Sequence, residues 1–108
     1  MGMTFKENVA DIRNSKVVDI INELKDFGVD VDVVDAYADP EEVKQMYGFS
    51  LIEKPRNNYD AVIVAVSHDA YKDLDEKYFK SLTCDNAVLV DVKGMYRGKI
   101  NELKYWSL

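Results

Sequence analysis

The segment after the first residues of the chain combines a glycine, two cations and the start of a helix. Gly2 lets the backbone turn closely, and Lys6 and Arg13 supply fixed positive charge. The helix that begins near Asn14 offers free backbone amides, so this corner could bind a diphosphate group. The alternative stays open that these charges are simply solvated and that Asp11 and Asn14 cap the helix.

A dinucleotide site must be weighed as well, because Asp35 ends an apolar segment where dinucleotide-binding folds place a ribose-binding acid. Such folds need the glycine pattern G-x-G-x-x-G in the first turn, and Gly2 is the only glycine there. The sequence therefore argues against NAD binding by this chain in the usual manner.

Three polar residues, Ser67, His68 and Asp69, follow the apolar run Ala61–Val66. Side chains adjacent in sequence cannot form the nucleophile, base and orienting acid of a catalytic triad. We expect Ser67 or Asp69 to cap a helix and His68 to lie at the rim of a cleft, with a general-base role for His68 as the alternative.

A lysine follows the second apolar run, Ala87–Val92. If both runs are parallel strands, Lys93 could reach an anion bound near Lys6, since both lysines then lie at the carboxyl edge of the sheet. The alternative is an ordinary strand end with a turn at Gly94.

Helices and strands alternate along the chain. Apolar spacing predicts helices over 14–27, 40–47 and after Asp75, with Asp39 and Pro40 starting the second. Strands are predicted at 29–34 near an edge, at 61–66 in the centre of the sheet and at 87–92, with a minor strand at 51–52 and an irregular tail from 94 to 108.

This order predicts a single α/β domain over residues 1–108, a three-layer Rossmann-like parallel sheet with helices on both faces. Met1–Thr4 supplies only the stump of a strand before the first helix. We therefore expect the first strand to be truncated.

Composition narrows the classes of partner. The formal net charge is −6, with 20 acids against 14 bases, which argues against nucleic-acid binding. No apolar run is long enough to span a membrane and no signal peptide opens the chain, so we expect a cytoplasmic protein. A single cysteine, Cys84, permits neither an internal disulfide nor a thiolate metal cluster.

Several motifs resemble one enzyme family. The run T-F-K-E-N-V-A-D-I-R-N-S-K-V at Thr4–Val17 resembles the start of the C-terminal UDP-binding domain of the UDP-glucose/GDP-mannose dehydrogenases. A-V-S-H-D at Ala65–Asp69, D-V-K-G at Asp91–Gly94 and the ending Y-W-S-L resemble the branch that acts on UDP-N-acetyl-hexosamines. The resemblance covers nearly the whole chain.

The resemblance implies that the domain binds the UDP moiety of a UDP-sugar at the interface with an NAD-binding domain. It implies that Phe5 and Lys6 contact the nucleotide sugar and that Arg13 faces the shared nucleotide and cofactor site. Lys93 stands where the family usually has a basic residue near the substrate, and Asp11 and His68 would lie at the rim.

In this family the sugar's C6 alcohol is oxidised to a carboxylate with NAD, which supplies precursors of surface polysaccharides. The NAD-binding turn, the dimerisation helix and the catalytic cysteine lie upstream of the resembling region, and Cys84 does not match that cysteine. We expect no catalytic residue, metal or cofactor in this chain alone. Ala36 also departs from the family's usual Asp-Pro pair.

Two other functions stay open from the residues. A flavodoxin-like nucleotide-responsive or protein-interaction domain, such as a signalling receiver, would need clustered acids for magnesium, and Asp35 alone does not supply them. A truncated strand would also leave an open edge through which copies of the chain could form a homo-oligomer.

Overall fold

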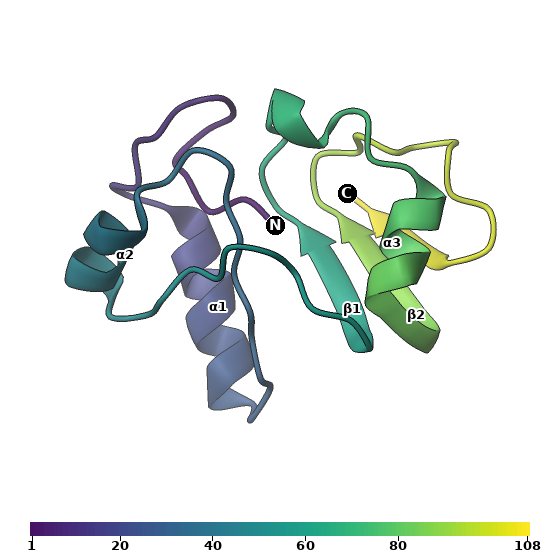
Figure 1. The fold of residues 1–108 in the computed structure, drawn as a ribbon, viewed down its shortest axis with the longest axis horizontal. Coiled ribbons are helices and arrows are strands. Elements are labelled where there is room, and N and C mark those ends of the chain that lie inside the picture. Colours follow the sequence, from purple (N-terminus) through teal and green to yellow (C-terminus); the bar gives the residue numbers. More distant parts are fainter.

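The computed structural model describes residues 1–108, in which two helices precede the first strand and a third helix lies between the first and second of three strands (Figure 1). The helices are α1 (Lys16–Asp26), α2 (Pro40–Tyr47) and α3 (Glu76–Leu82), with a 3₁₀ turn, η1 (Asp69–Tyr71), after the first strand. The strands are β1 (Tyr59–Val64), β2 (Thr83–Asp91) and β3 (Lys104–Ser107).

The three strands form one parallel sheet in the order β1-β2-β3, with Val62 beside Leu89 and Val90 beside Trp106. Helix α3 connects β1 to β2 and lies across the sheet (Figure 1). The α/β class and the parallel, Rossmann-like sheet are confirmed. Because all strands run the same way, the segments that follow them meet at one edge.

The tail was predicted to be irregular, and this was wrong for its last residues. Lys104–Ser107 forms β3 beside β2, and the Tyr105 hydroxyl donates a hydrogen bond to Asp91. Four residues with exposed and half-buried positions in alternation carry too little apolar signal to identify a strand from sequence.

The predicted places of two strands were also wrong. The run 61–66, expected at the centre of the sheet, contributes to β1 at an edge. Residues 29–34 form no strand, although the Val34 carbonyl accepts from the Gly2 amide and the Val33 carbonyl accepts from the Ile52 amide. Between residues 29–34 and β1, Met1 hydrogen-bonds to the β1 side and Gly2 to Val34. Two residues are too few to form a continuous hydrogen-bond ladder.

Met1 and Gly2 join the two halves of the molecule. The Met1 amine donates to the Ile63 carbonyl at 2.6 Å, and the Met1 carbonyl accepts from the Ala65 amide at 2.9 Å. Gly2 has φ +85°, and a β-carbon there would lie 2.7 Å from the Val66 β-carbon. The close backbone turn predicted for Gly2 is therefore confirmed, and a side chain is excluded by space as well as by conformation.

The helix starts agree in part with the sequence. The Asp39 carboxylate accepts from the Glu41 amide to cap α2, and the Asp75 carboxylate accepts from the Tyr78 amide at α3. Helix α1 begins instead after Ser15, whose hydroxyl donates to the Met3 carbonyl and caps nothing. Capping of α1 by Asp11 or Asn14 is therefore not observed.

The apolar interior consists of two clusters. The first packs α1 and α2 against residues 29–34 and contains Met3, Ile12, Val18, Ile21, Val33, Ala38, Val43 and Phe49. The second packs α3 against the sheet and contains Val62, Val64, Tyr71, Phe79, Leu82, Leu89 and Tyr96. No helix has the length and apolar character needed to cross a membrane.

Candidate functional site

The candidate residues lie on three segments at the carboxyl edge of the fold. The loop from Thr4 to Ser15 follows the Met1–Met3 stump, His68 follows β1, and Lys93 follows β2. The parallel arrangement places these segments at one edge, as the sequence predicted.

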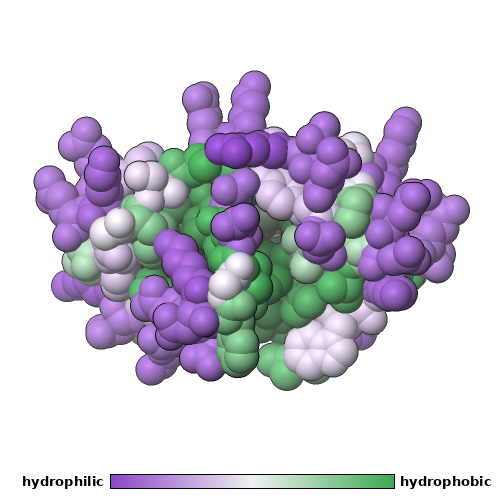
Figure 2. Space-filling model, turned by 90° about the horizontal axis from the view of Figure 1, so that it is seen from below, coloured by the Kyte–Doolittle hydropathy of each residue, from purple (hydrophilic) through white to green (hydrophobic).

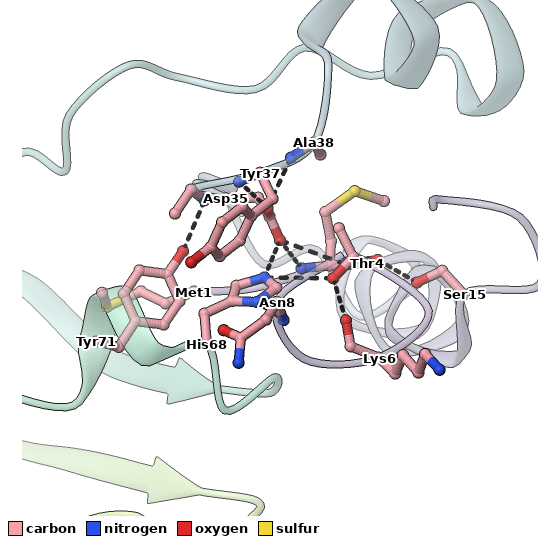
Figure 3. A network of polar contacts seen from close by, with 12 residues as sticks. Met1, Thr4, Lys6, Asn8, Ser15, Asp35, Tyr37, Ala38, His68 and Tyr71 are labelled. Atoms are coloured by element: carbon pink, nitrogen blue, oxygen red, sulfur yellow. Dashed lines mark hydrogen bonds and ion pairs between the residues drawn. The ribbon is translucent and has the colours of Figure 1, made fainter. Parts of the chain in front are cut away.

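A buried carboxylate organises this edge. Both oxygens of Asp35 accept backbone hydrogen bonds: Oδ2 from Met3 (2.6 Å) and Thr4 (3.3 Å), and Oδ1 from Tyr37 (2.7 Å) and Ala38 (2.9 Å). His68 Nε2 lies 3.0 Å from Oδ2, and both side chains are 0% exposed (Figure 3). One side chain thus ties the start of the loop to the turn after residue 34.

The environment of Asp35 keeps it ionised. Burial by itself raises the pKa of a carboxyl group, but the backbone amides of Met3, Tyr37 and Ala38, together with the His68 ring, donate to the charged form. These hydrogen bonds outweigh burial and hold the pKa of Asp35 below its ordinary value.

His68 fixes the middle of the loop. Its Nδ1 accepts from the Asn8 backbone amide at 2.9 Å, so the neutral ring carries its proton on Nε2, toward Asp35. The Asn8 side chain in turn accepts from the Asp69 amide at 2.7 Å, and Asn8 adopts φ +61°. Both ring nitrogens are therefore engaged.

His68 was expected at the rim of a cleft, and the structure instead buries it beneath the loop. Ser67 and Asp69 do not cap η1 with their side chains, because the residue at the N-cap is His68 itself. A buried ring with both nitrogens occupied has no access to a substrate proton, so the geometry gives no support to the general-base alternative.

The loop presents its remaining side chains to solvent. Phe5 is 56% exposed, and the Lys6 side chain points away from the buried network, while its backbone carbonyl accepts from the Thr4 hydroxyl at 2.9 Å (Figure 3). Arg13 forms a forked pair with Asp11, with both nitrogen–oxygen distances at 3.1 Å. The hydrogen bonds from Arg13 lower the pKa of Asp11.

Lys93 is exposed on a turn that hydrogen bonds to the preceding residue Asp91 stabilise. The buried Asp91 carboxylate accepts from the Met95 and Tyr96 amides at 3.0 and 2.8 Å, and Gly94 takes φ +73°. Lys93, Lys6 and Arg13 all carry positive charge, so their side chains could be joined only through a bound anion. The edge is shared, but a common ligand for the three cations stays a prediction.

Comparison with known proteins identifies the family of the chain. The UDP-binding domain of the UDP-glucose/GDP-mannose dehydrogenase family matches residues 1–98. The chain belongs to this family. It is a C-terminal UDP-binding domain, as the motifs at its start indicated.

The curated relatives that this chain matches are longer proteins. The chain is 38% identical over 94 residues to the UDP-N-acetyl-D-glucosamine 6-dehydrogenase of Salmonella typhi, covering 86% of this chain and 22% of that protein. It is 42% identical over 96 residues to Protein CapL of Staphylococcus aureus, covering 88% and 22%. The chain thus spans about a fifth of the length of these relatives.

A solved structure supports the fold. The UDP-binding domain resembles the native structure of the UDP-N-acetyl-mannosamine dehydrogenase Cap5O from Staphylococcus aureus with a TM-score of 0.75. The likeness covers 99% of this chain and 24% of that one, at 20% sequence identity.

The structure also bears on the alternatives. The Asp35 side chain is wholly buried and saturated with hydrogen bonds, so it offers no oxygen to a ribose, and the residues present do not fit NAD. No cluster of three or more acidic, histidine or cysteine side chains could hold a metal ion, as a receiver would require. The family match overrides the signalling alternative.

Cys84 is not placed as a nucleophile. Its thiol donates a hydrogen bond to Asp60 at 3.4 Å, and this interaction raises the thiol's pKa, the opposite of what activates a nucleophile. Sequence reasoning missed the network of Asp35, His68, Asn8 and Thr4, since its members lie far apart in sequence and only the fold brings them together.

Proposed function

We propose that the UDP-binding domain holds the UDP moiety of a UDP-sugar for a longer enzyme that oxidises the sugar's C6 alcohol to a carboxylate with NAD. Two relatives are named as UDP-N-acetyl-D-glucosamine 6-dehydrogenases, and another as a UDP-N-acetyl-D-mannosamine dehydrogenase. These names support a UDP-N-acetyl-hexosamine as the substrate class.

The observation that carries this proposal is the loop from Thr4 to Ser15, whose backbone is fixed by buried hydrogen bonds and which exposes Phe5 and Lys6 side by side. The Phe5 side chain is 56% exposed, so the face of its ring can stack on a pyrimidine base. Lys6, next in sequence, supplies a point charge for a phosphate. The Asp35–His68 network fixes the backbone beneath both, which limits the entropy lost on binding.

Arg13 and Lys93 act around that centre in the proposed complex. The Arg13 guanidinium faces the junction of nucleotide and cofactor and exchanges part of its pairing with Asp11 for the ligand. Lys93, on the neighbouring turn, approaches the anionic part of the substrate. The UDP group is remote from the reacting carbon, and its binding energy holds the sugar in position for oxidation.

The remaining parts of the reaction belong to other regions of the enzyme in this proposal. Residues 1–108 form one domain, and an NAD-binding domain completes the cleft and supplies the cofactor. We place the enzyme in the cytoplasm, in the synthesis of surface polysaccharide precursors, where the resembling branch of the family acts.

Calorimetric titration with UDP tests the proposal. We expect the 108-residue chain to bind UDP weakly, and Lys6→Ala to weaken binding at least about tenfold, equivalent to about 1.4 kcal/mol. Phe5→Ala should lower the affinity for UDP and for uridine alike, because it removes a base contact. Titration with NAD should give no heat of binding.

Lys54→Ala is the matched control, since Lys54 is an exposed lysine on the connection before β1. It should change the UDP affinity less than about twofold if local contact, not general charge, drives binding. An equal loss in Lys6→Ala and Lys54→Ala, or an unchanged affinity in Lys6→Ala, would refute the proposed site.

A further inference from the structure

The middle of the loop from Thr4 to Ser15 is attached to the rest of the molecule through one residue. Within residues 5–10, the hydrogen bonds that reach another segment both come from Asn8. Its backbone amide donates to His68 Nδ1 at 2.9 Å (Figure 3), and its side-chain oxygen accepts from the Asp69 amide at 2.7 Å. All but one of residues 5–10 are exposed, so apolar packing adds little support. The conformation of this segment therefore depends on the contact with His68. By contrast, the apolar surface in the middle of the face shown in Figure 2 belongs to the opposite side of the molecule from this loop.

The contact between Asn8 and His68 requires a neutral ring. Nδ1 accepts a hydrogen bond only while it carries no proton, and Nε2 lies 3.0 Å from Asp35 Oδ2 and 3.3 Å from Thr4 Oγ1. Protonation adds a second N–H at Nδ1, opposite the Asn8 N–H, so two donors meet. Turning the ring over does not help, since both nitrogens of the charged form are donors. The charged ring therefore keeps its pairing with Asp35 and loses its hydrogen bond to the loop.

The groups around the His68 ring act on its charge in opposite directions. The negative charge of Asp35 attracts a proton to the ring, whereas complete burial beside the Tyr37 and Tyr71 rings, 4.7 and 5.4 Å away, opposes a charge there. The Met1 ammonium interacts with the Asp35 charge, and burial lowers the pKa of this ammonium to about 6. Further charged side chains on the contacting segments lie at the surface, where water screens them: Lys6, Glu7 and Asp69.

The backbone of the loop favours release once the hydrogen bond to His68 is lost. Asn8 adopts φ +61°, a left-handed conformation that costs free energy in a residue with a β-carbon, and its hydrogen bonds to His68 and Asp69 offset this cost. An Asn8 amide that faces a charged donor is unsatisfied, whereas it binds water if the segment moves outward. Backbone contacts at the two ends of the loop, at Thr4 and Ser15, do not involve Nδ1, so release is confined to the middle.

We propose that His68 is a pH-sensitive positioning residue: the neutral ring holds Asn8, and protonation of the ring releases the middle of the loop and weakens the binding of a nucleoside diphosphate. The effect on binding rests on the proposed function, because Phe5 and Lys6 lie in the released segment. The effect on the loop does not. Reciprocity then requires that UDP, which favours the ordered loop, reduces proton binding by His68.

NMR of the 108-residue chain without UDP tests the effect on the loop. His68 is the only histidine, so its C2–H signal reports its titration directly. We expect the His68 C2–H shift and the Asn8 amide shift to change with one midpoint between about pH 8 and pH 5. The protection of the Asn8 amide against hydrogen exchange should fall at least about fivefold in the charged form, while that of Leu89 in β2 stays constant.

Two results of the NMR titration would overturn the proposal. One is an Asn8 amide whose shift and protection stay unchanged while His68 titrates. The other is a ring that stays neutral down to the acid unfolding of the chain.

Calorimetric titration with UDP at about pH 7.5 and about pH 5.5 tests the effect on binding, with His68→Asn as the matched variant. Asparagine offers an uncharged acceptor in place of Nδ1 at both pH values. UDP and the Met1 amine also take up protons in this range, but both chains share these effects, so the difference between the chains isolates His68. We expect acidification to weaken UDP binding at least about fivefold more in the wild type than in His68→Asn.

Equal losses of UDP affinity in the two chains would refute the effect on binding. If His68→Asn does not fold, the His68 titration of the wild type with and without UDP decides instead: a lower midpoint with UDP supports the proposal, and an unchanged midpoint with bound UDP overturns it. If neither chain binds UDP at either pH, the proposed function fails, and the NMR titration without UDP still decides whether His68 controls the loop.

Discussion

At the scale of single residues, Asp35 does more for the site than any side chain that faces solvent. Its carboxylate accepts hydrogen bonds from the Met3 amide at the start of the loop, from the Tyr37 amide after residue 34, and from His68. The His68 ring in turn accepts from the Asn8 amide in the middle of the loop. Loop residues such as Phe5 and Lys6 are therefore held by buried polar contacts rather than by apolar packing of their own side chains.

Replacing Asp35 with asparagine tests this role. An amide group can accept through only one atom, and its NH₂ group would face backbone N–H donors, so buried amides lose their partners. We expect Asp35→Asn to lower the free energy of unfolding by about 2–4 kcal/mol, measured by urea denaturation. Asp30→Asn, on the same segment but exposed, should change it by less than about 0.5 kcal/mol.

The same carboxylate should give the fold an acid dependence. The pKa of Asp35 is lowered in the folded state, so its contribution is complete above the unfolded value of about 3.9 and is lost as the pH falls through the folded-state pKa. Below pH 4 we expect the stability difference between the wild type and Asp35→Asn to shrink. A difference that stays constant down to the acid unfolding of either chain would contradict this assignment.

At the scale of elements, the short stump before the loop connects two parts that otherwise have separate cores. Met1 pairs with β1, and Gly2 pairs with the extended residues 29–34. Because Gly2 lies against Val66 with no room for a side chain, the approach of this stump to the end of β1 depends on a missing β-carbon.

Gly2→Ala and Gly48→Ala form a matched pair of substitutions. Both glycines have φ near +80°, but a β-carbon at Gly48 meets nothing within 4 Å, whereas at Gly2 it would meet Val66. We expect Gly48→Ala to cost about 1–2 kcal/mol of stability from backbone strain alone, and Gly2→Ala to cost at least about 1 kcal/mol more. Equal thermal midpoints for the two variants would show that the stump moves freely to accommodate the methyl group.

At the scale of the whole molecule, the two apolar clusters should differ in local stability. Helix α1 buries only Val18 and Ile21, and its neighbouring positions Ile20 and Leu24 line an open hollow between α1, residues 29–33 and β1. Strand β2 is covered by α3 and paired on both sides.

We therefore expect amides in α1 to exchange at least about tenfold faster than those in the middle of β2, through partial opening of the half that contains α1. Native-state hydrogen exchange followed by NMR measures this directly. Equal protection in α1 and β2 would mean that the two clusters unfold as one unit and that the hollow beside α1 does not lower the local stability there.

Much of the architecture follows from local signals. Apolar spacing places α1, the acids Asp39 and Asp75 start α2 and α3, and the continuous apolar runs identify β1 and β2. These features depend on residues close together in the chain, so they can be predicted from a single sequence. The exposed candidates Lys6 and Arg13 follow from charge near a helix start, and Phe5 follows from the family resemblance of the same continuous segment.

Only the tertiary structure decided three other points. It placed β1 at an edge of the sheet and left residues 29–34 outside the sheet, because a strand pairs only where a neighbouring strand lies at hydrogen-bonding distance along its length. It buried His68 against Asp35 under the loop, since residues 33 positions apart become partners only through folding. The sequence alone determined the family and the class of fold, because motifs and apolar runs are local features; burial and long-range hydrogen bonds decided which polar side chains stay exposed.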